Sequence, residues 1–128
     1  MSASDLSPDL KAFIFACIDT VEQMELLAVL RHSDAALTAQ ATGARLGITS
    51  AAARHHLEVL TARGLLHVEI SPEARYRYDP KAPQLRRYAD ELVNAYGTSR
   101  TLVLRVIAQN GTGSLKHFVN AFKLRRDE

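Results

Sequence analysis

The sequence predicts a mostly helical α+β fold, with several helices and one small β-hairpin. Apolar residues recur at spacings of three and four along most of the chain, which is typical of amphipathic helices. Residues 65–79 differ, because they have β-strand character on either side of the turn residues Ser71 and Pro72. The 128 residues are 47% hydrophobic and 23% charged, which is enough for one domain with a packed core.

The first helix is expected within residues 1–19. Ser7 suits an N-cap, Pro8 the first helical position and Asp9 the acidic first turn. The apolar side chains that follow at helical spacing are Leu10, Phe13, Ile14, Cys17 and Ile18. This helix should bury one face against the rest of the chain.

A second helix and a short third one are predicted next. Thr20 and Gln23 have the spacing of a capping box, so a helix begins there and ends in the polar residues 31–34. Thr38 can cap the short helix, which runs to Leu46.

A tight turn and a fourth helix follow. Gly43 supplies a small residue where two helices cross closely, and Gly47 permits the positive φ of a sharp reversal. Thr49 or Ser50 then caps a helix over residues 50–63. Gly64 stands where a left-handed residue ends such a helix.

The remaining elements are a hairpin and C-terminal helices. We predict a strand over residues 65–70, a turn over 71–74 and a returning strand over 75–79. Apolar residues then keep a seven-residue repeat from Leu85 to Val106, which indicates a long helix. A loop over residues 110–113 and a final amphipathic helix from Ser114 complete the chain. We divide the single domain of residues 1–128 into an N-terminal helix (1–19), a central unit (20–80) and C-terminal helices (81–128).

Charge is unevenly distributed along the chain. Residues 1–34 hold six Asp or Glu and two Lys or Arg, whereas residues 35–88 hold four acidic and eight basic residues. A basic middle segment favours a polyanionic partner, although an ordinary solvated surface explains it as well. The longest apolar run near the start is residues 12–18, and a membrane-spanning helix needs about 20 such residues. We expect a soluble cytoplasmic protein without a membrane partner.

The order helix, helix, tight turn, helix and two-stranded hairpin is that of a winged helix-turn-helix. The segment "LTAQATGARLGITSAAARHHLEVLTARGLL", within residues 21–80, resembles winged-helix transcriptional regulators of the MarR and ArsR type. The resemblance implies a regulator that binds double-stranded DNA through a recognition helix over residues 50–63 and a wing over 65–79.

The resemblance also assigns DNA-binding side chains. The outward face of the recognition helix holds Arg54, which can pair bidentately with guanine, and His55 beside it. Phosphate contacts are expected from the helix N-terminus. Arg75 and Arg77 alternate on a strand, so both should project from one face of the wing and reach phosphate or the minor groove. The full set of predicted DNA-binding residues is Thr49, Ser50, Ala51, Arg54, His55, Arg75 and Arg77.

The long helix after the wing looks like the dimerisation helix of such regulators, so we expect a homodimer. Burial of the repeat inside one chain is the alternative, but a helix this long rarely finds enough partner surface in a small domain. The predicted interface residues are Leu85, Tyr88, Leu92, Tyr96, Leu102 and Val106.

Other functions have weaker support. His55 and His56 are adjacent and point about 100° apart on a helix, so they cannot easily hold one metal ion, and we predict no metal site. His56 should face inward, and the single cysteine, Cys17, is best explained as a core thiol. No catalytic set and no phosphate-binding loop can be assembled, so we predict neither an enzyme nor a cofactor. The alternative to DNA binding is a winged-helix adaptor that binds a protein partner.

Overall fold

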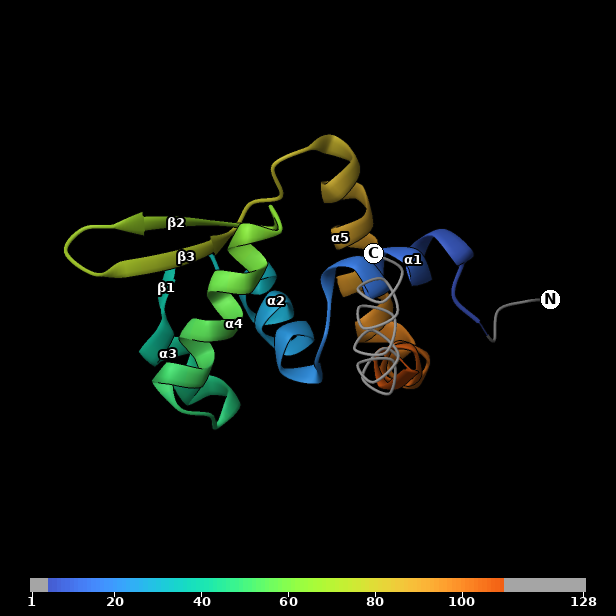
Figure 1. The fold of residues 1–128 in the computed structure, drawn as a ribbon, viewed down its shortest axis with the longest axis horizontal. Coiled ribbons are helices and arrows are strands. Elements are labelled where there is room, and N and C mark those ends of the chain that lie inside the picture. The colour runs from blue at the N-terminus through green and yellow to red at the C-terminus, as the bar shows by residue number, and fades with distance from the viewer. Residues whose placement is uncertain (1–4, 110–128) are drawn as a thin grey trace, which may run out of the picture.

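The computed structural model describes residues 5–109 (Figure 1). The elements, in chain order, are α1 (Pro8–Cys17), α2 (Val21–His32), β1 (Leu37–Thr38), α3 (Ala39–Leu46), α4 (Ser50–Ala62), β2 (Leu66–Ile70), β3 (Ala74–Tyr78) and α5 (Pro83–Thr98), and residues 100–109 are again helical. The predicted α+β class is confirmed.

The helices begin where the sequence places caps. Ser7, Thr20, Thr38 and Thr49 each accept, through the side-chain hydroxyl oxygen, a hydrogen bond of 3.0–3.1 Å from the amide nitrogen three residues later. Each cap satisfies a donor that the first turn of a helix leaves without an intrahelical acceptor. The predicted starts of α1, α2, α3 and α4 are confirmed.

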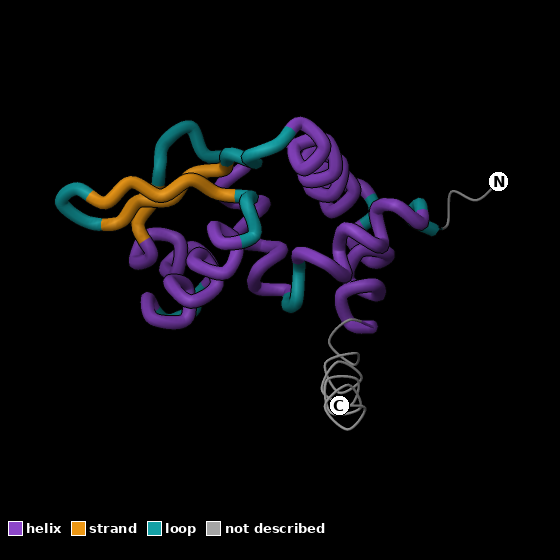
Figure 2. The backbone as a smooth tube through the Cα atoms, turned by 45° about the horizontal axis from the view of Figure 1, so that its top comes forward, coloured by secondary structure: helices purple, strands orange, loops and turns teal. Residues whose placement is uncertain are grey.

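α2 lies at the centre of the arrangement. It contacts α3, α4 and β3 on one side and α5 on the other, and α5 also packs against α1. Figures 1 and 2 show the β2–β3 hairpin projecting from α3 and α4, away from α1 and α5. The hairpin is therefore a wing beside the helix-turn-helix, and the terminal helices lie at the opposite end.

The sheet has one strand more than the sequence predicted. Its strand order is β1–β3–β2, with both pairs antiparallel. β1 has only two residues, Leu37 and Thr38, which pair with Tyr76 and Arg75 of β3. A strand this short has no periodicity to detect, and it is formed by a partner that lies far away in the sequence.

The prediction of one long helix from Leu85 to Val106 is wrong. α5 ends at Thr98, because Ser99 leaves helical geometry with φ −136° and ψ 51°. Gly97 has low helix propensity, and the Thr98 hydroxyl bonds to the Asn94 carbonyl oxygen, so the break falls among weak helix formers.

The break also changes the account of the apolar repeat. Leu92, Tyr96 and Val106 are buried within the single chain, while Leu85, Tyr88 and Leu102 are half-buried. The premise that one chain cannot cover this repeat is therefore wrong. The homodimer stays a prediction. Because Leu92 is buried within the chain, a dimer interface must use other residues.

Two sequence predictions concern residues that lie beyond the described part of the chain, namely the loop over residues 110–113 and the helix from Ser114. Within residues 5–109, no helix combines the length and apolar character needed to cross a membrane.

Candidate nucleic-acid interface

The turn between α3 and α4 fixes the direction of the predicted recognition helix. Gly47 has a φ of +75°, and the Ile48 amide donates to the Gly43 carbonyl oxygen at 3.0 Å. A Cβ atom on Gly43 would lie 2.9 Å from the Ile48 carbonyl oxygen and 3.2 Å from that of Thr49. The two helices therefore meet with their backbones nearly in contact, as the sequence predicted.

The exposed face of α4 carries the predicted polar side chains. Ser50, Ala51, Arg54 and His55 are all exposed, whereas the opposite face is buried through Ala53, Leu57 and Leu60. The helix N-terminus points its amide groups and positive dipole end outward, beside the cap residue Thr49. One helix thus presents its partly positive end and a guanidinium at the exposed surface.

Arg54 borders a shallow hollow of about 160 Å³ between α4, the start of α3 and the wing. Gln40, Ser50, Glu73 and Tyr76 also line it. Sequence reasoning missed Gln40 and missed Glu58, which is exposed one helical turn after Arg54. The i, i+4 spacing from Arg54 is the signal that could have identified Glu58.

The structure separates the wing arginines from Arg54. β3 buries Tyr76, which lines the hollow with Arg54, and its neighbours Arg75 and Arg77 point to the other face of the sheet. Arg75 contacts Glu73 at 3.2 Å near the wing tip, and Arg77 lies 3.9 Å from Asp79 at the wing base. Arg75 and Arg77 share a face, as predicted, but not the face of Arg54.

Behind the recognition helix, polar contacts fix its position against α2. The His56 Nδ1 atom lies 3.3 Å from Nε2 of the Gln23 side chain. Oε1 of the same side chain accepts a hydrogen bond of 2.7 Å from the backbone N–H of Asp19. Burial, followed by the neighbouring charge of His55, lowers the pKa of His56, which favours its neutral form. His56 is therefore an inward structural histidine, as predicted.

A contact between the end of α4 and the end of α1 lies at Cys17. Arg63 donates to the Cys17 carbonyl oxygen at 2.7 Å and to the Asp19 carboxylate at 2.9 Å. Cys17 is buried, and burial raises the pKa of its thiol, so the reactive thiolate is disfavoured. The interpretation of Cys17 as a core residue is confirmed. Within residues 5–109, no group of three or more potential ligands could hold a metal ion.

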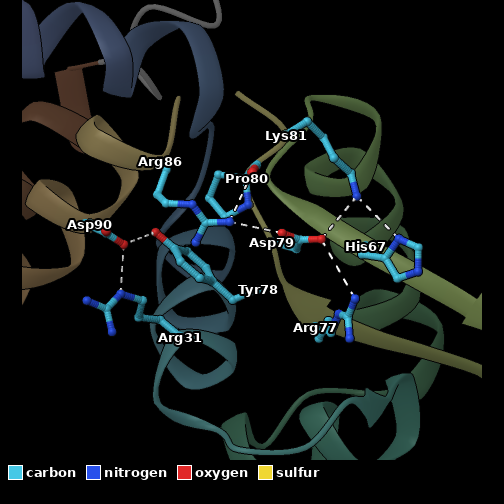
Figure 3. Close-up of polar contacts among 9 residues, drawn as sticks. All are labelled: Arg31, His67, Arg77, Tyr78, Asp79, Pro80, Lys81, Arg86 and Asp90. Atoms are coloured by element: carbon cyan, nitrogen blue, oxygen red, sulfur yellow. Dashed lines mark hydrogen bonds and ion pairs between the residues drawn. The ribbon is translucent and has the colours of Figure 1, made fainter. Parts of the chain in front are cut away.

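A polar junction joins the wing base to α5 (Figure 3). The Asp90 carboxylate accepts from the Tyr78 hydroxyl at 2.6 Å and from Arg31 Nε at 3.0 Å, which links α5 to β3 and α2. Burial and the hydrogen bond to Asp90 raise the pKa of Tyr78. Asp79 lies 3.0 Å from Arg86 and 3.6 Å from Lys81. Sequence reasoning missed this junction, whose link to α2 joins Arg31 and Asp90, 59 positions apart in the chain.

The comparisons with known proteins agree with this geometry for the central unit. Residues 22–69 match the model of a family described as a helix-turn-helix domain. The segment begins in α2 and ends in β2, so it includes both helices of the turn and the first strand of the wing. This match confirms the predicted helix-turn-helix within the central unit.

One solved structure is similar to this chain over most of its length. It is the crystal structure of the multiple antibiotic-resistance repressor (MarR) from Listeria monocytogenes 4b F2365, with a TM-score of 0.49 and 15% sequence identity. The alignment covers 93% of this chain and 84% of that one. A comparison with curated proteins gives no match.

Proposed function

We propose that this protein is a DNA-binding transcriptional regulator of the winged helix-turn-helix type. The observation that carries the proposal is the exposed face of α4, where Arg54, His55 and the helix N-terminus lie together beside the wing. A helix inserted in the major groove presents its N-terminal residues to base edges. The helix-turn-helix family match over residues 22–69 supports the same function.

Each predicted side chain has a distinct task in this proposal. Arg54 reads guanine through its planar fork, and Ala51 offers a methyl group to thymine. Thr49 and Ser50 donate to phosphate together with the amide groups of the first turn. His55 adds a hydrogen bond at the edge of the groove.

The wing arginines act on phosphate in this proposal. Arg75 lies near the wing tip and is the better placed of the two, although its pairing with Glu73 partly neutralises it. Arg77 belongs to the wing base and contributes mainly through charge. Phosphate contacts position the protein and carry no sequence information.

The proposed regulator acts as a homodimer, and an exposed apolar strip on α1 supports this. Phe15 is 41% exposed and lies between Ala12 and Ala16, which are also exposed. Leu85 and Tyr88 line a groove of about 380 Å³ between α1 and α5. A second copy would cover both surfaces at the end of the molecule opposite the wing.

Fluorescence anisotropy with labelled duplex DNA tests the function. Duplexes enriched from genomic fragments are compared with scrambled ones at several salt concentrations, because released counterions make phosphate-mediated binding fall steeply with salt. Arg54→Ala should weaken binding to the enriched duplex, and Arg87→Ala, an exposed arginine on α5, serves as the matched control. The proposal is contradicted if the affinity for DNA depends neither on the salt concentration nor on the sequence of the duplex.

A protein-binding adaptor is the second candidate, and one observation favours it. A groove of about 440 Å³ between α4 and the wing is lined by Ala62, Val68, Ile70 and Ala74. Ile70 is 75% exposed and lies in this groove, so it offers an apolar side chain that a protein partner could cover. Ile70→Ser should leave DNA affinity unchanged if the regulator is correct, and should abolish partner capture if the adaptor is correct.

A further inference from the structure

A wide hollow lies at the junction between the wing base and α5. It is an open cavity of about 580 Å³, formed by the end of α2, the segment before β1, the outer face of the wing and the first turns of α5. Its charged or polar lining residues are Arg31, Ser33, Asp34, Glu69, Arg77, Tyr78, Arg86 and Asp90. The volume falls within the range of small-molecule sites.

Three guanidinium groups converge on this cavity, and most of their donors remain available. Arg31 uses Nε on Asp90, and its guanidinium carbon lies 5.6 Å from the centre of the Tyr78 ring. Arg77 and Arg86 each direct one terminal nitrogen toward Asp79, at 3.9 Å and 3.0 Å. Arg86 also donates to the Pro80 carbonyl oxygen at 3.3 Å, and Figure 3 shows these contacts. Each guanidinium has five N–H donors in a planar fork, so the contacts made within residues 5–109 leave donors on all three.

Two carboxylates on the rim complement these arginines. Asp34 and Glu69 are exposed, line the same cavity and form no ion pair with another described residue. With Asp90, the lining holds three carboxylates and three guanidiniums, so its formal charge is balanced. A ligand that carries both charges would engage more of this lining than a ligand that is only an anion or only a cation.

We propose that the junction cavity binds a small zwitterion, with a carboxylate and an ammonium group on one molecule, as in a free amino acid. The carboxylate takes the open guanidinium edges of Arg77 and Arg86, where bidentate pairing is strongest. The ammonium group lies against Asp34 and Glu69. Arg77 also contributes charge to the proposed DNA surface, so this site and the phosphate contacts of the wing base share one guanidinium.

A ligand bound in the cavity would alter the contacts that hold the wing to α5. The ligand carboxylate competes with Asp79 for Arg77 and Arg86, and it lies beside the Tyr78–Asp90–Arg31 contacts. On the proposed DNA-binding function, the ligand then changes DNA affinity by linkage between the two sites. Binding of the zwitterion itself does not depend on that function.

The test uses the full chain and the standard L-amino acids, added one at a time. Melting curves identify those that stabilise the fold, and calorimetric titration measures their affinity. Acetate and ethylamine, which each carry one half of the charge pair, are the matched ligands and should bind much more weakly. Arg77→Gln should reduce the affinity of the best amino acid about tenfold or more, because hydrogen bonds to charged groups are lost. Glu69→Gln should reduce it in the same direction.

The control variant is Arg87→Gln, since Arg87 is exposed next to Arg86 but does not line the cavity. It should keep the affinity of the wild-type protein. No stabilisation by any amino acid overturns the proposal, as does equal binding of acetate or unchanged affinity in Arg77→Gln. These readouts contain no DNA, so a failure here is distinguishable from a failure of the proposed function.

Discussion

Replacing Gly43 by alanine tests the close approach of α3 and α4. A Cβ atom at this position meets the Ile48 carbonyl oxygen at 2.9 Å, the Thr49 carbonyl oxygen at 3.2 Å and the Ala53 Cβ at 3.4 Å. Two of these neighbours are backbone atoms of the turn, which cannot rotate away as the end of a flexible side chain can. The added methyl group must therefore push the recognition helix away from α3.

The magnitude follows from two opposed effects. Overpacking a tight contact costs about 1–3 kcal/mol, while alanine gains about 1 kcal/mol over glycine through helix propensity. Because the closest contact lies below the range that real Cβ atoms show, we expect the upper part of the first range. The free energy of unfolding should fall by about 1–2 kcal/mol in total.

Gly97 provides the matched control, because a Cβ atom there would have no neighbour within 4 Å. Gly97→Ala in α5 should raise the free energy of unfolding by about 0.5–1 kcal/mol through propensity alone. Urea denaturation followed by circular dichroism measures both variants with the same probe. If Gly43→Ala is as stable as the wild-type protein, or gains as much as Gly97→Ala, the contact between the helices is looser than described.

The remaining predictions concern DNA reading, assembly and pH. Arg54→Ala should weaken binding to a preferred duplex by about 1–3 kcal/mol with unchanged melting, and Arg54→Lys should restore affinity more than sequence preference, as anisotropy would show. Phe15→Glu should convert a dimer to a folded monomer in sedimentation, whereas Leu92→Glu should unfold the chain; a monomeric wild-type protein would contradict the first expectation. The lowered pKa of His56 means that the unfolded chain takes up the proton more readily, so stability should be constant above about pH 6.5 and fall below it. His56→Gln should reduce this loss of stability at acid pH. If the free energy of unfolding of the variant falls with pH as steeply as that of the wild-type protein, another group causes the loss.

Local signals explain why so much of the fold could be predicted from the sequence. A helix cap needs only the hydroxyl of a residue such as Thr38 and the backbone N–H three residues later. The residues that form this contact therefore lie close together in the sequence pattern that predicts it. Gly47 and Gly64 both have positive φ, and both positions were predicted from the ends of the preceding helices. The outward position of Arg54, which the resemblance implied, agrees with the helical period that buries Ala53 and Leu57.

Features that depend on distant partners could not be predicted in this way. β1 exists because Leu37 meets Tyr76, and no property of residues 37–38 shows that partner. The repeat from Leu85 to Val106 indicated a buried stripe, but not whether the chain itself or a second copy buries it. The contact between Arg31 and Asp90 joins residues 59 positions apart, beyond any local pattern.

The two faces of the wing divide its charged residues between different tasks. On one face, Tyr76 packs beside Arg54 and α4, so this side continues the proposed DNA surface. On the other face, Arg77 approaches Asp79, which Lys81 and Arg86 also contact. One carboxylate therefore engages three cations at the wing base, and their attraction for phosphate is reduced where the wing meets α5. The charge proposed to act on DNA is accordingly greatest at α4 and the wing tip, whereas Arg77 at the wing base contributes less.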